Sequence, residues 1–436
     1  MNDTQPGPQP RMIAGLALSA LLAALGTSVA NVALPTLATE FGVALGQVQW
    51  VVLAYLIAMT ATAVQVGGLG DRFGRQRVLL MGLGLFLVAT LACALAASFP
   101  ALVVARALQG IGGAVLVALP MAIARDVVPA ERLGSAMGLL GTTAAIGTAL
   151  GPAAGGLLLG SFGWQAMFVV MLPLGLGALA LLGGRGVLGS SGFRVATGGA
   201  VGDKAARAAR GRRGRGSGAW ELVRTRAFAA ALAMNLLVGT VMMSTLIVGP
   251  FFLTAGLGLS AASVGLTMAV GPAVAAVTGV IAGKVVDTVG ASRGTVFGLS
   301  IMVLGMAALA GLPAVLGVVG YVLALIVLTP GYQLFLAANN TAALGDIEAR
   351  RRGAASGMLS LSRNLGLMLG ASAMGWLYAA VAGSSATNGA SVPVAAVAGS
   401  QVTFVLGGVL TLTALEFALA LWRARTDRLQ TRRGLV

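Results

Sequence analysis

The amino-acid sequence predicts an all-α membrane protein with twelve transmembrane helices arranged as two six-helix pseudo-repeats. Of its 436 residues, 58% are hydrophobic and only 9% are charged, whereas about a quarter of a typical soluble chain is charged. Apolar runs of roughly 18 residues or more, long enough to cross a bilayer as helices, recur along the chain. Two segments of the first half also return in the second half at nearly the same offset, which predicts the repeat.

Charges and turn residues interrupt the apolar runs and divide the chain into twelve predicted helices. The first six cover residues 12–34, 46–67, 78–98, 101–124, 133–159 and 165–183. The second six cover residues 228–254, 262–283, 294–312, 314–340, 353–380 and 399–422. The first segment also fits a secretory signal peptide, but its cleavage would leave an odd number of spans and disturb the sidedness of the charges.

The basic residues predict the orientation of these helices. Lys and Arg residues occupy every second loop and both ends of the chain, whereas the intervening loops hold one charged residue, Glu40. By the positive-inside rule, this pattern predicts a multi-pass protein of the cell (inner) membrane with both termini in the cytoplasm. Only two basic residues, Arg106 and Arg363, fall inside predicted spans.

The predicted domains follow from the helices and the charges. An N-terminal six-helix half, 1–183, and a C-terminal six-helix half, 228–422, are joined by a cytoplasmic Gly/Arg-rich linker, 184–227, and followed by a basic cytoplasmic tail, 423–436. Gly/Arg-rich segments also occur in RNA-binding proteins. Attraction to anionic lipid is the simpler account of a basic loop tethered to a membrane, so no nucleic-acid partner is expected.

The composition also argues against several kinds of chemistry. The chain has no histidine and one cysteine, Cys93, which disfavours zinc, haem and His-based catalysis and precludes an intrachain disulfide. No nucleophile or acid–base constellation is recognisable. We therefore expect that the protein is not an enzyme and that it needs neither a metal nor another cofactor.

Two pairs of sequence segments relate the two halves. In the first pair, five residues recur 216 positions later: Gly67, Asp71, Gly74, Arg77 and Gly82 correspond to Gly283, Asp287, Gly290, Arg293 and Gly298. In the second pair, residues 134–156 match residues 353–375 without gaps at an offset of 219. Halves that repeat in the same orientation imply a pseudo-two-fold axis along the membrane normal, a substrate site near the midplane and alternating access by rocking.

Three motifs resemble those of the major facilitator superfamily. The stretch GGLGDRFGRQR (67–77) resembles the family's signature loop between helices 2 and 3, with a degenerate copy at 283–293. The stretch RALQGIGGA (106–114) resembles the helix 4 motif of its drug:proton antiporters, and GTALGPAAGG (147–156) resembles the helix 5 motif associated with exporters. The resemblance covers essentially the whole chain and implies the major facilitator fold.

The resemblance to one antiporter branch fails at one position. NVALP (31–35) and QWVVLAY (49–55) resemble the first two helices of a branch whose drug antiporters often have fourteen helices, whereas this chain has room for twelve. Where that branch usually has an aspartate in helix 1, this chain has Gly26. The one acid inside a predicted span is Glu416, which either carries protons or snorkels to the cytoplasmic face.

The resemblance implies roles for three groups of motif residues. The coupling motif would comprise Arg106, Gln109, Gly110 and Gly113. The gating loop would comprise Gly67, Asp71, Arg72, Gly74, Arg75, Arg77, Asp126, Asp287 and Arg293, with Asp126 as the partner of Arg75. The helix 5 hinge, sliding against helix 8, would comprise Gly147, Gly151, Pro152, Gly155 and Gly156. Topogenic charge and generic close packing are the plainer alternatives.

A substrate cavity is expected between the halves, lined by helices 1, 4, 7 and 10 with contributions from helices 2, 5, 8 and 11. Its candidates are polar or soft residues that have few natural partners in lipid. They are Asn31, Tyr55, Gln65, Asn235, Met242, Tyr332, Gln333, Asn339, Arg363 and Asn364. Packing or hydrogen bonding between helices is the alternative role for each of them.

The resemblance implies a secondary active transporter that exports small amphipathic or apolar compounds, drugs or metabolites, by proton antiport and alternating access. The expected partners are a small-molecule substrate, protons, and anionic lipid at the basic cytoplasmic loops, and the protein is expected to be a monomer. The missing helix 1 acid leaves a first alternative, a metabolite or organic-anion exporter that is not coupled to protons. A second alternative is a non-transporting assembly factor or sensor on the same fold.

Arg106 raises a specific question, because a guanidinium in hydrocarbon costs roughly 2.5 kcal/mol or more. The resemblance implies that it holds a fixed positive charge beside the transport path, favouring ionisation of a nearby acid or attracting substrate. Since Gly26 occupies the acidic position, we expect neutralisation by Gln109, by helix 1 carbonyls, by water or by an anionic substrate.

Overall fold

The structure is a computed structural model that describes residues 10–183, 223–345, 347–348 and 351–433. The described residues form helices and no strands, which confirms the predicted all-α class. Residues 184–222, which make up most of the predicted linker, and residues 434–436 of the predicted tail lie outside the described part of the chain.

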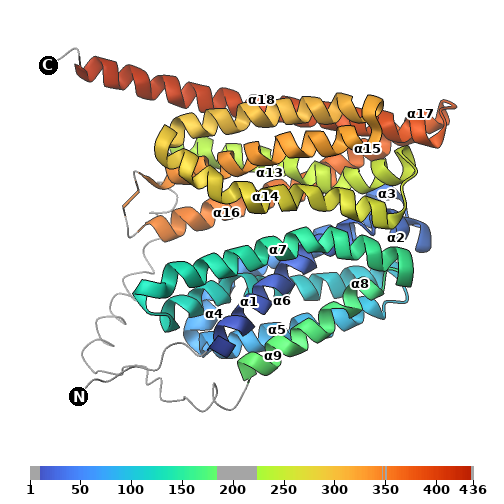
Figure 1. Cartoon of the computed structure of the whole chain (residues 1–436), viewed down its shortest axis with the longest axis horizontal. Coiled ribbons are helices and arrows are strands. Elements are labelled where there is room, and N and C mark those ends of the chain that lie inside the picture. Colours follow the sequence, from blue (N-terminus) through green and yellow to red (C-terminus); the bar gives the residue numbers. More distant parts are fainter. Residues whose placement is uncertain (1–9, 184–222, 346, 349–350, 434–436) are drawn as a thin grey trace.

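The first group of helices contains ten elements, and the apolar runs of the first half supply its long ones. They are α1 (Pro10–Ser28), η1 (Val29–Asn31), α2 (Leu34–Glu40), α3 (Leu45–Val48), α4 (Trp50–Phe73), α5 (Arg75–Ala94), α6 (Phe99–Val127), α7 (Ala130–Phe162), α8 (Ala166–Val169) and α9 (Met171–Gly183). Short breaks within a run, as between α8 and α9, do not end its passage across the bundle (Figure 1).

The second group contains eight elements. They are α13 (Arg226–Phe251), η3 (Phe252–Gly256), α14 (Ala261–Val289), α15 (Ala291–Gly345), α16 (Arg352–Leu369), η4 (Gly370–Met374), α17 (Gly375–Thr387) and α18 (Val392–Arg433). The elements η3 and η4 are π-helical turns that continue α13 and connect α16 to α17. The two helical stretches α16 and α17 therefore belong to one crossing, Ala355–Thr387.

α15 contains two crossings rather than one. A straight helix of its 55 residues would be about 80 Å long, more than twice the thickness of a bilayer core. The chain reverses at Gly317, where φ is +56°, and a Cβ on Gly305 would lie 2.6 Å from the Cα of Leu328. The two arms therefore pack antiparallel. Eleven segments of the described residues are long and apolar enough to span a membrane, and the reversal in one of them makes twelve crossings.

The position of this reversal differs from the prediction. The sequence analysis placed the break at residue 313 because proline interrupts helices. In the structure Pro313 is buried inside α15, and the chain turns four residues later. The turn requires a positive φ, which glycine at position 317 adopts without steric cost.

The signature loop is also shorter than predicted. The glycine-rich stretch from Gly67 onward continues α4 as a helix to Phe73, and the turn consists of Gly74 alone, with φ of +90°. Close packing favours the helix, because a Cβ on Gly70 would lie 3.2 Å from a methyl carbon of Leu119 on α6. The repeat of this loop ends α14 in the same way at Gly290, where φ is +87°.

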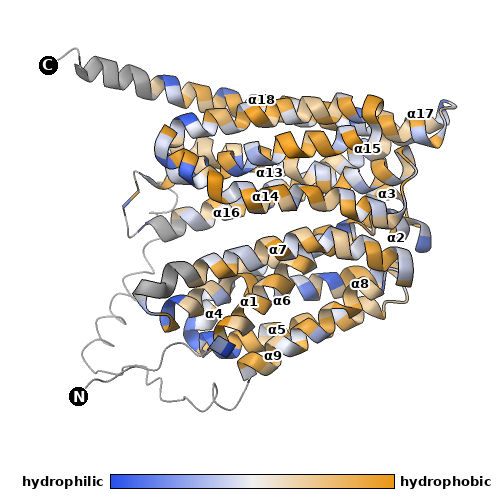
Figure 2. Cartoon of the chain, viewed as in Figure 1, coloured by the Kyte–Doolittle hydropathy of each residue, from blue (hydrophilic) through white to orange (hydrophobic). Residues whose placement is uncertain are grey.

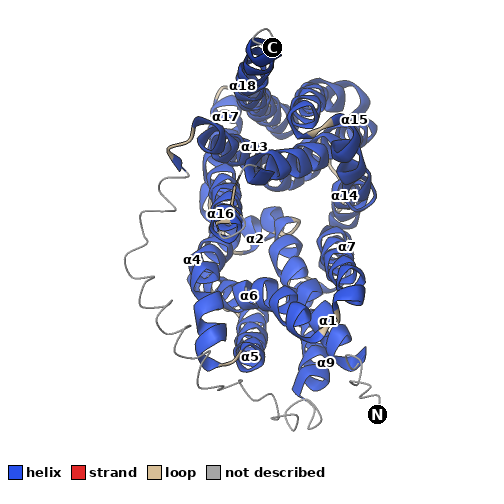
Figure 3. Cartoon of the chain, turned by 90° about the vertical axis from the view of Figure 1, so that its left-hand side faces the viewer, coloured by secondary structure: helices blue, strands red, loops and turns tan. Residues whose placement is uncertain are grey.

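The two groups lie side by side, with the start of α1 and the end of α18 at the same end of the molecule (Figure 1). They meet along two helix pairs, α7 with α14 and α4 with α16 (Figure 3). We call the end that holds the start of α1, Gly74 and Gly290 the basic end, and the opposite end, which holds Gly317, the distal end. Hydrophilic residues concentrate at the basic end, whereas the helices are mainly hydrophobic along their length (Figure 2).

Large apolar side chains cover the outer surface of the bundle. Met81, Val315 and Trp376 are 72%, 82% and 67% exposed, as side chains that face lipid would be. Lipid removes the hydrophobic drive for helices to associate, so close packing through small residues replaces it. A Cβ on Gly112 would lie 2.8 Å from the carbonyl oxygen of Gly82, which shows how closely α6 and α5 approach.

Candidate functional site

Arg106 lies on α6 inside the first group and is completely buried. It is about 10 Å along the axis from the first residue of α6, which places it in the distal half of that helix. Its Nε donates to the carbonyl oxygen of Val51 at 2.9 Å, and its Nη1 donates to the carbonyl oxygen of Gly26 at 3.0 Å and to Oε1 of Gln109. Helices α1 and α4 therefore both contribute acceptors to this guanidinium.

The acceptors of Arg106 are neutral. Within the described residues no carboxylate lies within ion-pair distance of the guanidinium, and its Nη2 has no hydrogen-bond partner. Each charge-assisted hydrogen bond contributes about 1.5 kcal/mol or more. Together, the three bonds offset the roughly 2.5–3.5 kcal/mol that it costs to insert an arginine into the membrane. Two of the neutral acceptors proposed from the sequence, Gln109 and a helix 1 carbonyl, are thus present.

Tyr55 contacts three of the four residues of the coupling motif. The Cζ of Arg106 lies 4.4 Å from the centroid of the Tyr55 ring, a cation–π contact. A Cβ on Gly110 would overlap the Tyr55 carbonyl group, and a Cβ on Gly113 would reach the Tyr55 hydroxyl. The two glycines therefore allow α6 to lie against α4. Tyr55 itself is fully buried, so it lies inside the first group rather than on an open wall.

Gln109 extends this network to α5. Its Nε2 donates to the hydroxyl of Thr90 at 2.8 Å, and Thr90 donates to the carbonyl oxygen of Phe86 at 2.6 Å. The sequence analysis did not select Thr90, because a threonine in an apolar helix usually bonds to its own backbone. Its position facing Gln109 depends on how α5 packs against α6, which the sequence alone does not show.

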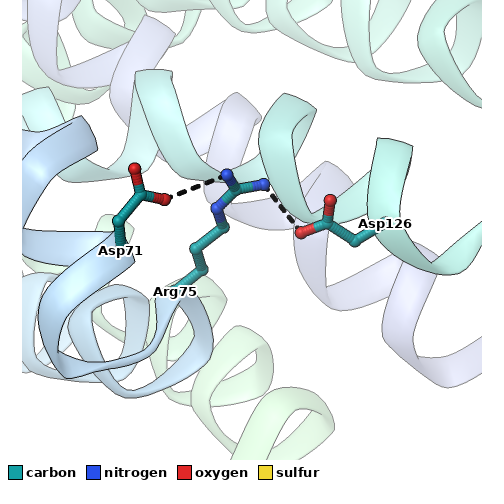
Figure 4. A network of polar contacts seen from close by, with 3 residues as sticks. All are labelled: Asp71, Arg75 and Asp126. Carbon is teal, nitrogen blue, oxygen red and sulfur yellow. Dashed lines mark hydrogen bonds and ion pairs between the residues drawn. The ribbon is translucent and has the colours of Figure 1, made fainter. Parts of the chain in front are cut away.

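The gating-loop residue Arg75 bridges three helices at the basic end (Figure 4). Its Nη2 lies 3.0 Å from Asp71 at the end of α4, and its Nη1 lies 2.7 Å from Asp126 near the end of α6. The expected pairing with Asp126 is therefore present in the structure. All three side chains are at least 36% exposed, so each ion pair contributes little stability, about 0–1 kcal/mol. The geometry ties α4, α5 and α6 together.

The other gating-loop residues lack this connection. Gly67, Arg72 and Arg77 are exposed, and the guanidinium of Arg72 lies 5.1 Å from the ring centroid of the adjacent Phe73. In the repeat, Asp287 and Arg293 are exposed and make no ion pair with any described residue. Ala291 stands where the first copy has Arg75, so the repeat has no side chain to form the bridge.

The structure corrects the predicted contact of the helix 5 hinge. A Cβ on Gly147 would lie 2.7 Å from the carbonyl oxygen of Leu21, and Gly151 and Gly155 likewise face η1 and the end of α1. Residues four apart share one helix face, and that face packs inside the first group. The expectation that this glycine ladder slides against helix 8 is therefore wrong for these three residues.

Gly156 and Pro152 do face the second group. A Cβ on Gly156 would lie 2.7 Å from the Cα of Gly265 on α14, and a Cβ on Gly265 would contact the carbonyl oxygen of Pro152. The backbones of α7 and α14 therefore touch towards the distal end. Position 156 is one residue beyond the α1-facing ladder, which turns it by about 100° around the helix.

A second close contact between the groups lies at the corresponding position of the repeat. Gln49 is buried at the start of α4, and a Cβ on Gly375 would contact its side-chain amide. Gly375 aligns with Gly156 at the offset of 219, and Gly265 aligns with Gln49 at the offset of 216. The two groups thus touch at two pseudo-equivalent points. The contact of helix 5 with helix 8 was expected for the hinge residues and is present at Pro152 and Gly156, whereas the contact between Gln49 and Gly375 was not expected from the sequence.

Several candidates for the substrate cavity connect helices of the second group. The Nδ2 of Asn339 donates to Oδ1 of Asn235 and to the carbonyl oxygen of Ala231, each at 3.1 Å. Asn235 in turn donates to the carbonyl oxygen of Leu359 on α16 at 3.4 Å. Both asparagines are at most 2% exposed, so they join α13, α15 and α16 as packing residues.

The remaining candidates are dispersed. Gln333 donates to the carbonyl oxygen of Ala275 at 3.0 Å, and Gln65 is exposed on α4. Asn31 is buried, and its Oδ1 has no hydrogen-bond partner in the described part of the chain. The Nε of Arg363 is likewise buried without a partner. The other candidates are partly buried: Met242, Tyr332 and Asn364.

The fold and these motifs define a membrane transporter built from two related groups of six crossings. The chain belongs to the major facilitator superfamily, whose family model matches residues 16–371. This match spans most of both groups and includes all three motifs.

Curated relatives share different lengths of the chain. The uncharacterized transporter YebQ of Escherichia coli is 30% identical over 80% of this chain and 85% of its own length. The riboflavin transporter RibZ of Clostridioides difficile is 33% identical over 38% of this chain and 36% of its own length. The tetracenomycin C resistance and export protein of Streptomyces glaucescens is 35% identical over 39% and 32%, respectively.

A solved structure supports the fold alone. A bacterial homologue of the human lysosomal transporter Spinster, in an inward-facing and unoccupied conformation, matches with a TM-score of 0.76 and 19% identity. The match covers 94% of this chain and 97% of that protein. The major facilitator fold predicted from the motifs is thus confirmed.

Proposed function

We propose that the protein is a secondary active transporter that exports small amphipathic or apolar compounds, drugs or metabolites, by alternating access. The observation that carries this proposal is the pair of pseudo-equivalent contacts at the distal end, Gly156 with Gly265 and Gln49 with Gly375. Two related groups that touch at two symmetric points can separate there by rocking. The helix 5 motif and the relative named as a resistance and export protein support export as the direction.

In this proposal the basic end faces the cytoplasm, as the positive-inside rule implies. The structure then represents a conformation closed towards the outside, from which substrate enters from the cytoplasm. Opening the distal contacts would release the substrate outside. Arg75, which bonds to both Asp71 and Asp126, would make α4, α5 and α6 move as one body. In the described conformation these ion pairs stay within the first group.

Proton antiport is the coupling that the family resemblance implies, and it remains part of the proposal. Glu416 is the acid available within a span, and it is exposed on α18. A proton carrier works by changing its charge between the two conformations, so it should lie at a contact that changes. Among the described residues, the two distal contacts contain no carboxylate that could carry a proton. Coupling of transport to protons therefore needs its own test.

Organic-anion export without proton coupling is the second candidate function. It is favoured by two guanidinium groups inside the spans that have unused N–H donors, Nη2 of Arg106 and Nε of Arg363. Both would attract an anion rather than repel it. A membrane potential of 100 mV, negative inside, would favour the exit of a monovalent anion by about 2.3 kcal/mol.

One vesicle experiment separates the two candidates and tests transport itself. Inside-out vesicles that contain the protein would be given ethidium or carboxyfluorescein, which represent cationic and anionic amphipathic probes. A pH gradient and a potassium diffusion potential would be imposed separately. Proton antiport predicts uptake that stops when the pH gradient collapses, whereas anion export predicts carboxyfluorescein uptake that follows the potential.

Vesicles with an Arg106→Met variant provide the matched control. Uptake that is equal in the variant, the wild type and empty vesicles under both gradients would contradict the transport proposal for these probe classes. The result would then favour the non-transporting alternative considered in the sequence analysis.

A further inference from the structure

A cavity of about 470 Å³ lies inside the second group at the basic end, away from the contacts between the groups. The starts of α13 and α15 border it, together with the end of the second arm of α15 and the later part of α18. Its wall is mainly apolar, with Ala231, Ala343 and Leu421 among the lining residues. Asn339 also borders it, which connects the cavity to the asparagine network between α13 and α16.

The repeat explains why the cavity is in the second group. In the first group, Gln76 at the start of α5 donates from Nε2 to the carbonyl oxygen of Leu182 on α9 at 3.2 Å, so its side chain connects these two helices. The residue at the equivalent position, 216 residues later, is Ser292, whose side chain is shorter. Ala342 lines the cavity where the same offset would place the counterpart of Asp126. Shorter side chains at these two positions therefore leave room for the cavity in the second group.

The polar part of the wall is suited to an anion. Arg226 is the one charged residue among the described residues that line the cavity, and no described carboxylate forms an ion pair with it. The first turns of two helices, α13 at Arg226 and α15 at Ser292, border the same space. Helix N-termini carry a partial positive charge and offer backbone N–H groups. The hydroxyl of Thr225 does not cap α13.

The rest of the wall is suited to an amphipathic molecule at the membrane surface. Trp422 borders the cavity and is 36% exposed, and tryptophan prefers the interface between lipid and water. Arg224, Arg293 and Arg423, which neighbour lining residues in sequence, are exposed. Basic residues of this kind attract anionic lipids. The cavity therefore combines an anion-binding end with an apolar end at the expected depth of lipid headgroups.

From this arrangement we infer that the cavity between α13, α15 and α18 binds the phosphate-bearing headgroup of an anionic phospholipid from the surrounding leaflet. Arg226 and the two helix N-termini hold the phosphate, and Trp422 and Leu421 pack against the apolar part. Through Asn339 and Asn235 the bound lipid would stabilise the packing of α13 on α15 and α16. The site is separate from the proposed transport path, and its test does not depend on transport.

The test measures thermal unfolding of the purified full-length protein during titration with phosphatidylglycerol, phosphatidylcholine or inorganic phosphate. We expect phosphatidylglycerol to raise the unfolding temperature in a saturable way and phosphatidylcholine to have no such effect. Arg226→Gln should raise the phosphatidylglycerol concentration for half-maximal effect about fivefold, the value of one basic residue near a lipid surface. Arg11→Gln, which changes an exposed arginine at the same end of the molecule but in the first group, should leave it unchanged.

A second variant tests the cavity without changing its charge. Ser292→Gln introduces the longer side chain that the first group has at the equivalent position, so it should abolish the saturable effect of phosphatidylglycerol. Equal effects of the two lipids, equal effects of the two arginine variants, or full phosphatidylglycerol binding by Ser292→Gln would each overturn the proposal. Stabilisation by inorganic phosphate that depends on Arg226 would assign the cavity to a free anion and overturn the lipid assignment.

Discussion

The contact between Gly156 and Gly265 makes a sharp prediction for the substitution Gly156→Ala. The new Cβ would lie 2.5 Å from the carbonyl oxygen of Ala261 and 2.7 Å from the Cα of Gly265, whereas ordinary contacts of a Cβ begin at 3.4 Å. The difference is 0.7 to 0.9 Å. Both opposing atoms belong to the backbone, so no rotamer change relieves the overlap and α7 and α14 must move apart.

The magnitude follows from the cost of overpacking, which is typically about 1–3 kcal/mol. This strain exists only in conformations in which the distal end is closed. A difference of about 1–3 kcal/mol changes a two-state equilibrium by about 5- to 150-fold. We therefore expect Gly156→Ala to shift the population strongly towards conformations with an open distal end.

Electron–electron double resonance measures this shift directly. Spin labels would be attached at Glu40→Cys, in α2, and at Asn388→Cys, after α17, in a protein whose native cysteine is replaced by Cys93→Ala. Both labelled positions are exposed at the distal end, one in each group. We expect Gly156→Ala to populate longer distances than the wild type.

Gly160→Ala is the matched control, because the nearest atom to its new Cβ, the amide nitrogen of Ala262, is 3.9 Å away. It should reproduce the distance distribution of the wild type. An unchanged distribution in Gly156→Ala, or an equal change in Gly160→Ala, would refute the reasoning that links this contact to distal closure.

Three further variants test other parts of the account. In Gly375→Ala the new Cβ meets the end of the Gln49 side chain rather than backbone, and that side chain can change its rotamer. We therefore expect transport into vesicles within about twofold of the wild type. A tenfold loss would contradict the idea that the contact at Gly375 tolerates a Cβ better than the backbone contact at Gly156. Arg75→Ala removes two exposed ion pairs and should lower the free energy of unfolding by less than about 2 kcal/mol. We expect it to reduce transport at least tenfold, with Arg125→Ala as the control. Equal transport in both variants would contradict the proposed coupling of α4, α5 and α6. Arg106→Met loses three hydrogen bonds but also removes the cost of burying a charge, and these two contributions are of similar size. Thermal unfolding should therefore change by less than about 2 kcal/mol while transport is lost. A large loss of stability with normal transport per folded protein would contradict the functional role.

The sequence predicted the general fold well because bilayer physics constrains it strongly. Span length, charge sidedness and the repeat each follow from local sequence, and together they gave twelve helices in two groups. Helix ends were less accurate: the turn at Gly317 replaced the predicted break at Pro313, and α4 continued through the glycine-rich stretch to Phe73. For α4, packing against α6 overrode the local preference for a break, whereas the turn in α15 lies at the glycine that adopts the positive φ.

The candidate site was predicted less completely, because contacts between helices depend on rotation about their axes. The acceptors of Arg106 were anticipated in part, because the glycine at position 26 leaves only neutral groups in helix 1 to accept its hydrogen bonds. The separation of Gly156 from the ladder at Gly147 was not anticipated, although one residue turns a side chain by about 100°. The repeat could have predicted that the two contacts are equivalent, because the offset of 216 relates Gln49 to Gly265 and the offset of 219 relates Gly156 to Gly375.

Transport by alternating access requires the two groups to separate at the distal end. Cross-linking of Gln49→Cys to Gly375→Cys in the Cys93→Ala protein tests this requirement, because the two positions face each other across the contact between the groups and a disulfide forms only between closely facing residues. We expect oxidation to abolish uptake into vesicles and a reductant to restore it. Uptake at the rate of the reduced protein after complete cross-linking would contradict it.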